Sequence, residues 1–83
     1  MTVRVKLHAI LRKFLPPESK DNALVLELPE GATVAEVITR LGIPPKHAGM
    51  FVAGDQTLEA GSRLRDGQEL SIFPPLAGGL SAN

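Results

Sequence analysis

The sequence predicts an α+β domain in which one main helix covers one face of a sheet of four to five strands. Three observations predict this class: short segments with alternating apolar residues, one segment with helical apolar spacing, and Pro or Gly at the segment ends. The 83 residues allow one small domain, since a domain has about 150 residues on average.

The first two strands are predicted from alternation with a period of two. Every second residue is apolar in 2–8 and 24–28, which gives each strand one core face: Val3, Val5 and Leu7 in the first, and Leu24, Leu26 and Leu28 in the second. His8 falls on the polar face and is expected to contact solvent. Residues 16–22 form a polar, turn-rich surface loop, and Pro29 ends the second strand.

Between Gly31 and Gly42 the apolar spacing becomes that of an amphipathic helix. The apolar residues follow i, i+3, i+4 and i+7: Val34, Val37, Ile38 and Leu41. Thr33 and Glu36 have the spacing of a capping box, in which each side chain accepts a hydrogen bond from a backbone N–H at the helix start. Gly42 suits the left-handed position that follows a helix.

Short strands are predicted after the helix over residues 50–53, 56–59 and 69–73. Gly54-Asp55 and Asp66-Gly67 are turn sequences, and Leu64 is expected to fill the core between them. The alternation of the last strand places two residues inward, Leu70 and Ile72, and two outward, Ser71 and Phe73. Pro74 and Pro75 end this strand, because proline cannot donate a ladder hydrogen bond.

Composition excludes several function classes. Nine Lys plus Arg balance nine Asp plus Glu, so there is no overall field to attract nucleic acid or an anionic membrane, and we expect neither partner. The absence of Cys excludes disulfides, a thiolate nucleophile and Cys-based zinc sites, and it favours a cytoplasmic location. A domain this small rarely holds a deep catalytic pocket, so we expect a binding or carrier protein rather than an enzyme.

Few residues are candidates for chemistry within the domain. The sequence has no glycine-rich phosphate loop, dinucleotide fingerprint or metalloprotease motif. His8 and His47 lie on separate elements, so we predict no metal site and no bound cofactor. The N-terminal segment has a basic bias that is either a solvated surface or a docking patch for an acidic partner: Arg4, Lys6, Arg12, Lys13 and Lys20.

The C-terminal segment is the most informative. Residues 70–83 contain no charged side chain. Two prolines are expected to hold the exit from the last strand extended, and Gly78-Gly79 presents a backbone without Cβ obstruction. Such a tail fits a narrow channel in another protein, and Pro74 to Gly79 spans about 20 Å when extended. We therefore predict a domain over residues 1–75 and a flexible tail over 76–83, with an unused tail as the alternative.

The order of the elements together with the run Ile72-Phe73-Pro74-Pro75-Leu76-Ala77-Gly78-Gly79 resembles the MoaD/ThiS family of ubiquitin-like sulfur carriers, and is more similar to MoaD than to ThiS. The resemblance covers residues 2–79. It implies a β-grasp (ubiquitin-like) fold with a mixed sheet. Ala53 and Gln68 depart from residues that are common in the family, at positions away from the chemistry.

The resemblance implies a non-catalytic role in sulfur transfer. In the family, an E1-like adenylyltransferase (MoaB, MoeB or ThiF type) uses ATP to adenylate the terminal glycine carboxylate, and sulfur then displaces AMP to give a thiocarboxylate. Gly79 would be the activated residue, within a tail that includes Leu76, Ala77 and Gly78. A MoaE-type synthase large subunit would receive the sulfur for molybdopterin-type cofactor biosynthesis, and Phe73, Pro74 and Pro75 would contact the partners.

Two features leave alternatives open. Phe73 and Leu76 are expected to form an apolar partner patch, although Phe73 also fits a simple edge contact. Leu80, Ser81, Ala82 and Asn83 follow Gly79, which therefore has no free carboxylate. Cleavage after Gly79 by a processing protease would expose a free carboxylate on this residue. Two other interpretations of residues 80–83 are that they are a fusion remnant, or that the domain keeps only a binding role.

A second functional class competes with the sulfur carrier. A ubiquitin-like protein modifier would use the same activated glycine to form a conjugate with lysine on another protein, and a non-activated interaction module would form neither product. The sulfur acceptor stays open at this point among a pterin, a thiazole, an amino acid and RNA, because carriers for all four share this tail.

Overall fold

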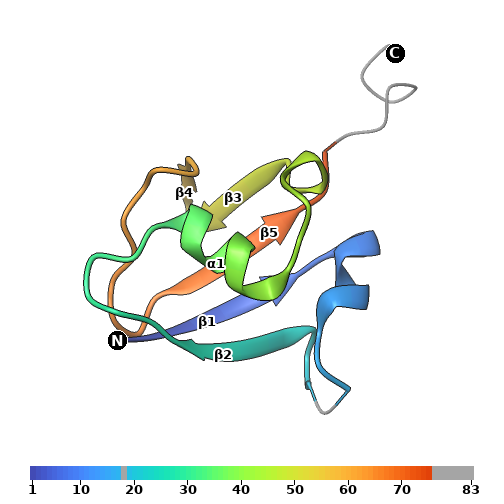
Figure 1. The fold of residues 1–83 in the computed structure, drawn as a ribbon, viewed down its shortest axis with the longest axis horizontal. Helices are drawn as coiled ribbons and strands as arrows, with labels where there is room; N and C mark the ends of the chain where they lie inside the picture. The colour runs from blue at the N-terminus through green and yellow to red at the C-terminus, as the bar shows by residue number, and fades with distance from the viewer. Residues whose placement is uncertain (18, 76–83) are drawn as a thin grey trace.

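A five-stranded sheet carries the helix α1 (Val34–Leu41) on one face, as Figure 1 shows. The computed structural model describes residues 1–17 and 19–75. The strands are β1 (Thr2–Leu7), β2 (Ala23–Glu27), β3 (Met50–Ala53), β4 (Gln56–Leu58) and β5 (Glu69–Phe73), in the spatial order β2-β1-β5-β3-β4. β1 and β5 run parallel and the other neighbours antiparallel, so the α+β class with a mixed sheet is confirmed.

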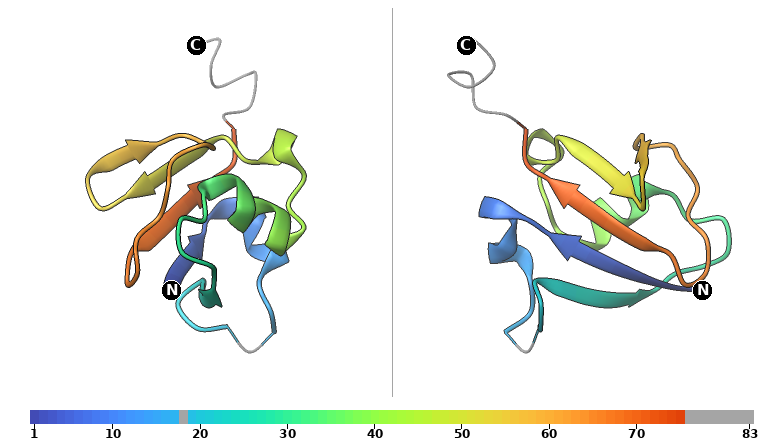
Figure 2. Two further views of the ribbon diagram at one scale, coloured as in Figure 1. Left: turned by 60° about the vertical axis from the view of Figure 1, so that its left-hand side comes forward. Right: turned by 180° about the vertical axis from the view of Figure 1, so that it is seen from behind.

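The core lies between the sheet and α1, and the predicted alternation supplies most of it. The inward residues of the two central strands are fully buried: Val3, Val5, Leu7, Leu70 and Ile72. Val34 and Val37 meet them from the helix, and Leu64 closes the core with 4% of its surface exposed. Figure 2 shows the sheet from behind, with the strands in front of α1, so the outer face of the sheet carries no helix there.

The C-terminal end of α1 agrees with the prediction, whereas the N-terminal end differs from it. Gly42 adopts the left-handed conformation, with φ 73°. The capping box is wrong, because the side chain of Thr33 makes no capping hydrogen bond. The N–H groups of Val34 and Ala35 instead donate to carbonyls in the loop before β5, at 3.0 and 2.9 Å, and Glu36 N–H donates to the Thr33 carbonyl at 3.1 Å. A chain segment distant in sequence therefore satisfies the helix start.

Two short 3₁₀ helices were not predicted: η1 (Ala9–Phe14) and η2 (Pro45–His47). Both are too short to show a helical apolar period. η1 is held by Leu11, whose side chain is fully buried, while the neighbouring Ile10 is 62% exposed. Among the residues described, no helix has the length and apolar character needed to cross a membrane.

Candidate functional site

β5 leads directly to the tail, so the end of the molecule around Phe73 is the candidate functional site (Figure 1). Because β1 and β5 are parallel, the end of β1 lies beside the end of β5, and the start of β3 lies on the other side. Phe73 points to the outer face of the sheet, as predicted, and is half-buried. Pro74 is also half-buried and Pro75 is exposed.

His8 packs against Phe73. The two rings are stacked, with centroids 4.1 Å apart and planes inclined by 9°, and the backbone N–H of His8 donates to the Ile72 carbonyl at 3.2 Å. The Nε2 atom of His8 is buried and has no hydrogen-bond partner among the described residues. The end of β5, 65 positions away in the sequence, therefore covers one face of the His8 ring, while part of the residue stays exposed, so the expected contact with solvent is only partial.

Met50 completes an apolar surface beside the exit of the tail. It is the register partner of Phe73 across the antiparallel β3–β5 pair, and 46% of its surface is exposed. We call the three side chains His8, Met50 and Phe73 the exit cluster. The predicted partner patch also included Leu76, which lies outside the described residues, as do Ala77, Gly78 and Gly79.

Gly49 allows the prolines to pass close to β3. Its N–H donates to the Phe73 carbonyl at 2.8 Å. A Cβ atom on this residue would lie 2.8 Å from the carbonyl carbon of Pro74 and closer still to the backbone of Pro75, distances that real Cβ atoms do not adopt. Only glycine therefore fits without a shift of the backbone at the exit. A glycine directly before a strand was the available sequence signal for this close approach.

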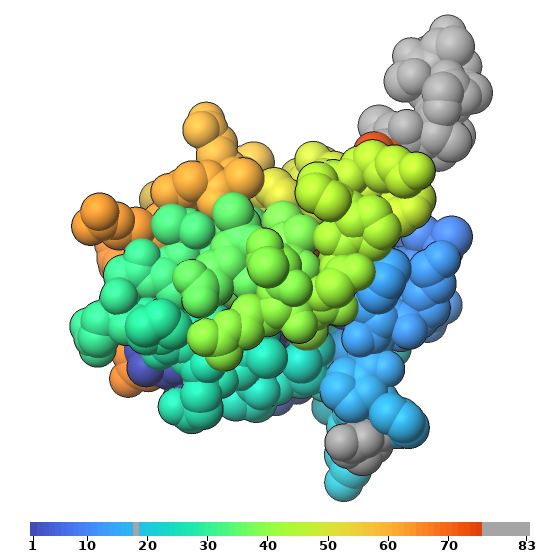
Figure 3. All heavy atoms as spheres, viewed as in Figure 1, coloured from blue at the N-terminus to red at the C-terminus, as the bar shows by residue number. Residues whose placement is uncertain are grey.

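The segments that meet around the exit are basic. Residues 1–17, 43–53 and 70–75 contain no Asp or Glu, whereas four lysines and arginines lie near this end: Lys6, Arg12, Lys13 and Lys46. In Figure 3 the blue η1 and the yellow-green η2 segments lie beside each other here. At the opposite end, Asp66 and Glu27 accept hydrogen bonds from Thr2 at 2.7 Å each. Although the net charge is zero, the charged side chains are unevenly distributed between the two ends of the molecule.

Several surface features meet at the exit. They are the apolar exit cluster, the nearby cations and a strand end that two prolines follow. Among residues 1–17 and 19–75, no three His, Asp or Glu side chains come together as metal ligands. His47 lies in η2, on a different element from His8, which follows β1.

Comparison with known proteins places the fold in a recognisable group. The ThiS family model matches residues 5–79. No curated protein is significantly similar in sequence. A provisionally named molybdopterin converting factor, subunit 1, from Pyrococcus furiosus superposes with a TM-score of 0.68 at 21% identity, covering 90% of this chain and 98% of that one. SAMP1 from Haloferax volcanii superposes with a TM-score of 0.70 at 19% identity, covering 95% of this chain and all of that one.

Proposed function

Since this chain belongs to the ThiS family, we propose that it is a sulfur carrier whose reactive group is the carboxylate of Gly79. The observation that carries the proposal is the extent of the family match, which includes Gly78-Gly79 and stops before Leu80. The similar fold of the Pyrococcus furiosus protein fits a role in molybdopterin-type cofactor biosynthesis. The molecule would act in the cytoplasm as a protein co-substrate, with all catalytic groups on its partners.

The chemistry requires an activated carboxylate, because a carboxylate is a poor electrophile. An oxygen of the Gly79 carboxylate attacks the α-phosphorus of ATP, an acyl adenylate forms, and pyrophosphate leaves. Hydrosulfide then attacks the carbonyl carbon, AMP leaves, and loss of the proton on sulfur gives the thiocarboxylate. ATP is bound by the activating E1-like enzyme, so this chain needs no cofactor of its own.

The exit geometry supports delivery of the tail into a partner. Phe73 is anchored by ladder pairing and by the His8 stack, and the close passage of the prolines over Gly49 fixes the direction in which the chain leaves the sheet. We propose that the exit cluster and the nearby cations contact the activating enzyme and the large synthase subunit in turn. Residues 1–75 would stay outside while residues 76–79 enter the active site.

A processing step belongs to the proposal, because Gly79 is joined to Leu80 by a peptide bond. Cleavage after Gly79 by a protease removes four residues and about 385 Da, and replacing oxygen by sulfur then adds about 16 Da. The intact mass of the chain therefore reports both steps.

The test compares the full chain with a chain that stops at Gly79. Both are incubated with an E1-like adenylyltransferase, ATP and a sulfur donor, and their intact masses are measured. The shortened chain is expected to gain about 16 Da only when ATP is present, and the full chain is expected to stay unchanged. A shortened chain without the increment, under conditions in which the enzyme activates its own carrier, contradicts the sulfur-carrier function.

The same activation reaction, carried out in a cell extract, distinguishes a sulfur carrier from a ubiquitin-like modifier. If the activated glycine is transferred to an amine, a cell extract containing ATP will yield conjugates between Gly79 and lysine side chains. Trypsin leaves residues 66–79 attached to these lysines, because Arg65 is the last Lys or Arg before Gly79. A ubiquitin-like modifier gives these conjugates without the thiocarboxylate. A non-activated interaction module gives neither product, even after residues 80–83 are removed.

A further inference from the structure

β2 is an edge strand with exposed backbone groups. It pairs with β1 on one side only. Backbone hydrogen bonds at the two ends of the β1–β2 pair show which residues of β2 bond to β1. At one end, the Met1 amino group donates to the Leu28 carbonyl at 2.7 Å, and the Leu28 N–H donates to the Met1 carbonyl at 2.8 Å. At the other end, the Leu7 N–H donates to the Asn22 carbonyl at 2.9 Å. In an antiparallel pair alternate residues bond to the neighbour. The backbone groups of Ala23, Val25 and Glu27 therefore point away from the sheet.

Some of these outward groups have partners within the chain. The N–H of Ala23 donates to the Lys20 carbonyl at 3.0 Å, and the guanidinium of Arg40 donates to the Glu27 carbonyl at 3.2 Å. The two backbone groups of Val25 lie between these contacts and have no partner among the described residues. They form an acceptor and a donor at the centre of the edge.

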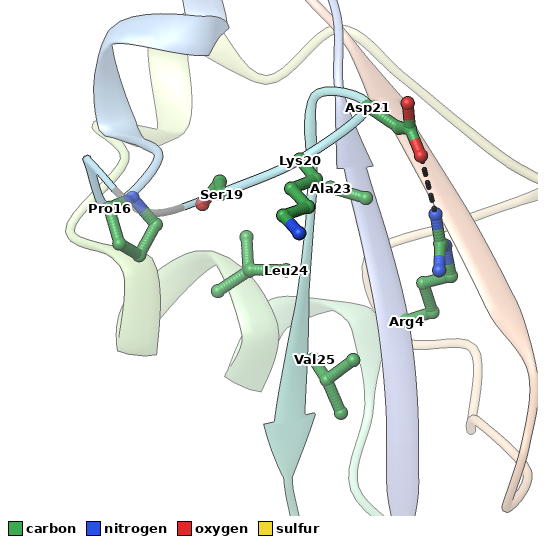
Figure 4. Close-up of a pocket in the computed structure, with 8 residues that line it drawn as sticks. All are labelled: Arg4, Pro16, Ser19, Lys20, Asp21, Ala23, Leu24 and Val25. Carbon is green, nitrogen blue, oxygen red and sulfur yellow. Dashed lines mark ion pairs between the residues drawn. The ribbon is translucent and has the colours of Figure 1, made fainter.

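A groove of about 470 Å³ runs along this edge (Figure 4). Pro16 and Leu24 line it on the helix side of β2, whereas Arg4 and Asp21 line it on the outer side, so the hollow straddles the strand edge. Val25 is 59% exposed at the groove. The volume is that of a site for a small ligand or a short chain segment, which are typically about 300–1,000 Å³.

The central part of the β2 edge lacks the usual protection against pairing, whereas Glu27 and the contacts of Ala23 and Glu27 cover its two ends. Edge strands are generally blocked by charged side chains, prolines or bulges, because their unpaired backbone is a template for another strand. Residues 23–26 of β2 are Ala-Leu-Val-Leu, and none of these devices occurs among them. The groove and the unpaired Val25 backbone thus occupy the same unprotected segment.

The charge of the groove favours an acidic occupant. Arg4 is engaged by Glu69 at 3.2 Å and by Asp21 at 3.9 Å. Lys20 also lines the groove and makes no ion pair with any residue that the structure describes. A carboxylate on the occupant would find its counter-ion in Lys20.

We propose that the β2 edge binds an extended segment of a partner protein, which pairs its backbone with Val25 and places an acidic side chain near Lys20. Strand addition of this kind takes its affinity from main-chain hydrogen bonds and its specificity from alternate side chains. The proposal goes beyond the sulfur-carrier function and does not depend on Gly79, since β2 and the exit cluster lie on different parts of the sheet.

The test is a titration of the full ¹⁵N-labelled chain with the peptide acetyl-Glu-Val-Thr-Val-Thr-Val-Glu-amide, followed by NMR. The amide resonances of Val25 and Glu27 are expected to move and to exchange more slowly with solvent as roughly millimolar peptide is added. The same peptide N-methylated at its central residues lacks the necessary donors and should cause no change.

Two variants separate the backbone contact from the charge contact. Val25→Pro removes the outward N–H and should weaken binding about tenfold, whereas Thr57→Pro in the opposite edge strand β4 should not affect it. Edge strands tolerate proline, and the dispersion of the NMR spectrum verifies folding. Lys20→Glu, in the loop before β2, should reverse the preference in favour of a peptide with Lys in place of both Glu residues.

Three outcomes would overturn the proposal. The first is the absence of any change at residues 23–27 with millimolar peptide. The second is a set of shifts centred on another element. The third is a change at β2 that depends on the concentration of this protein without peptide, which would identify a second copy of the chain as the occupant instead.

Discussion

The imidazole ring of His8 lies flat on the phenyl ring of Phe73, with centroids 4.1 Å apart and an interplanar angle of 9°. The stack joins the end of β1 to the last residue of β5, directly before the prolines that lead into the tail. It therefore holds the end of β5 against the end of β1.

Removal of this stack should destabilise the domain moderately. His8→Ala is expected to lower the free energy of unfolding by about 1 kcal/mol, the typical contribution of an aromatic pair. His8→Phe keeps the ring and removes the unpaired buried Nε2, so its stability should equal or exceed that of the parent. Urea unfolding followed by circular dichroism measures both values. Equal stability for His8→Ala and the parent would show that the stack contributes nothing.

Replacement of Gly49 by alanine should disturb the exit. The new Cβ meets the backbone of Pro74 and Pro75, which has to move, and we expect a loss of about 1–3 kcal/mol in the free energy of unfolding. Gly61→Ala is the matched control, since nothing lies within 4 Å of its Cβ position. The control should be neutral or slightly stabilising. If both variants unfold at the same urea concentration, the close passage over Gly49 is not a constraint.

Alanine substitutions at the two neighbouring apolar residues of η1 should have very different effects on the free energy of unfolding. Leu11→Ala removes a fully buried side chain and is expected to cost about 2–5 kcal/mol. Ile10 is 62% exposed, and Ile10→Ala should change stability by about 0.5 kcal/mol or less. Thermal unfolding of the two variants side by side tests the position of η1 on the core. Similar losses for both would contradict it.

The cations near the exit should accelerate encounter with an acidic partner. Lys46→Glu is expected to slow the association of the processed chain with its activating enzyme, with an effect that fades as salt is added. Arg63→Glu makes the same charge change beside the start of α1, far from the exit, and should have a much smaller effect. Stopped-flow fluorescence at several salt concentrations gives the rate constants. Equal slowing by both variants would indicate a general charge effect instead.

A substitution that adds one methyl group to Gly79 tests whether this residue is the reactive one. In a chain that stops at residue 79, Gly79→Ala should abolish ATP-dependent gain of sulfur while the free energy of unfolding stays unchanged, because residue 79 follows the end of β5 by six positions in the sequence. Intact mass and urea unfolding are the two readouts. Retained sulfur transfer would count against the proposed carrier chemistry at this position.

The sequence by itself determined the strands, the helix and the turns that depend on residues close together in the chain. Alternation in Val3, Val5 and Leu7 and the helical spacing from Val34 to Leu41 are set by short-range geometry, so the strands, α1 and the inward face of each could be predicted. The prolines that end β5 and the left-handed Gly42 follow from backbone sterics alone. The family motif in residues 72–79 likewise required no structure.

Only the tertiary structure decided which distant segments meet. The parallel pairing of β1 with β5 brings His8 to Phe73, the loop before β5 replaces the expected side-chain caps of α1, and Gly49 is needed because the prolines cross it. The edge position of β2 also depends on strand order rather than on its own residues. These contacts join groups far apart in the chain, and their free energy is gained only once the whole sheet has formed, so no local pattern records them.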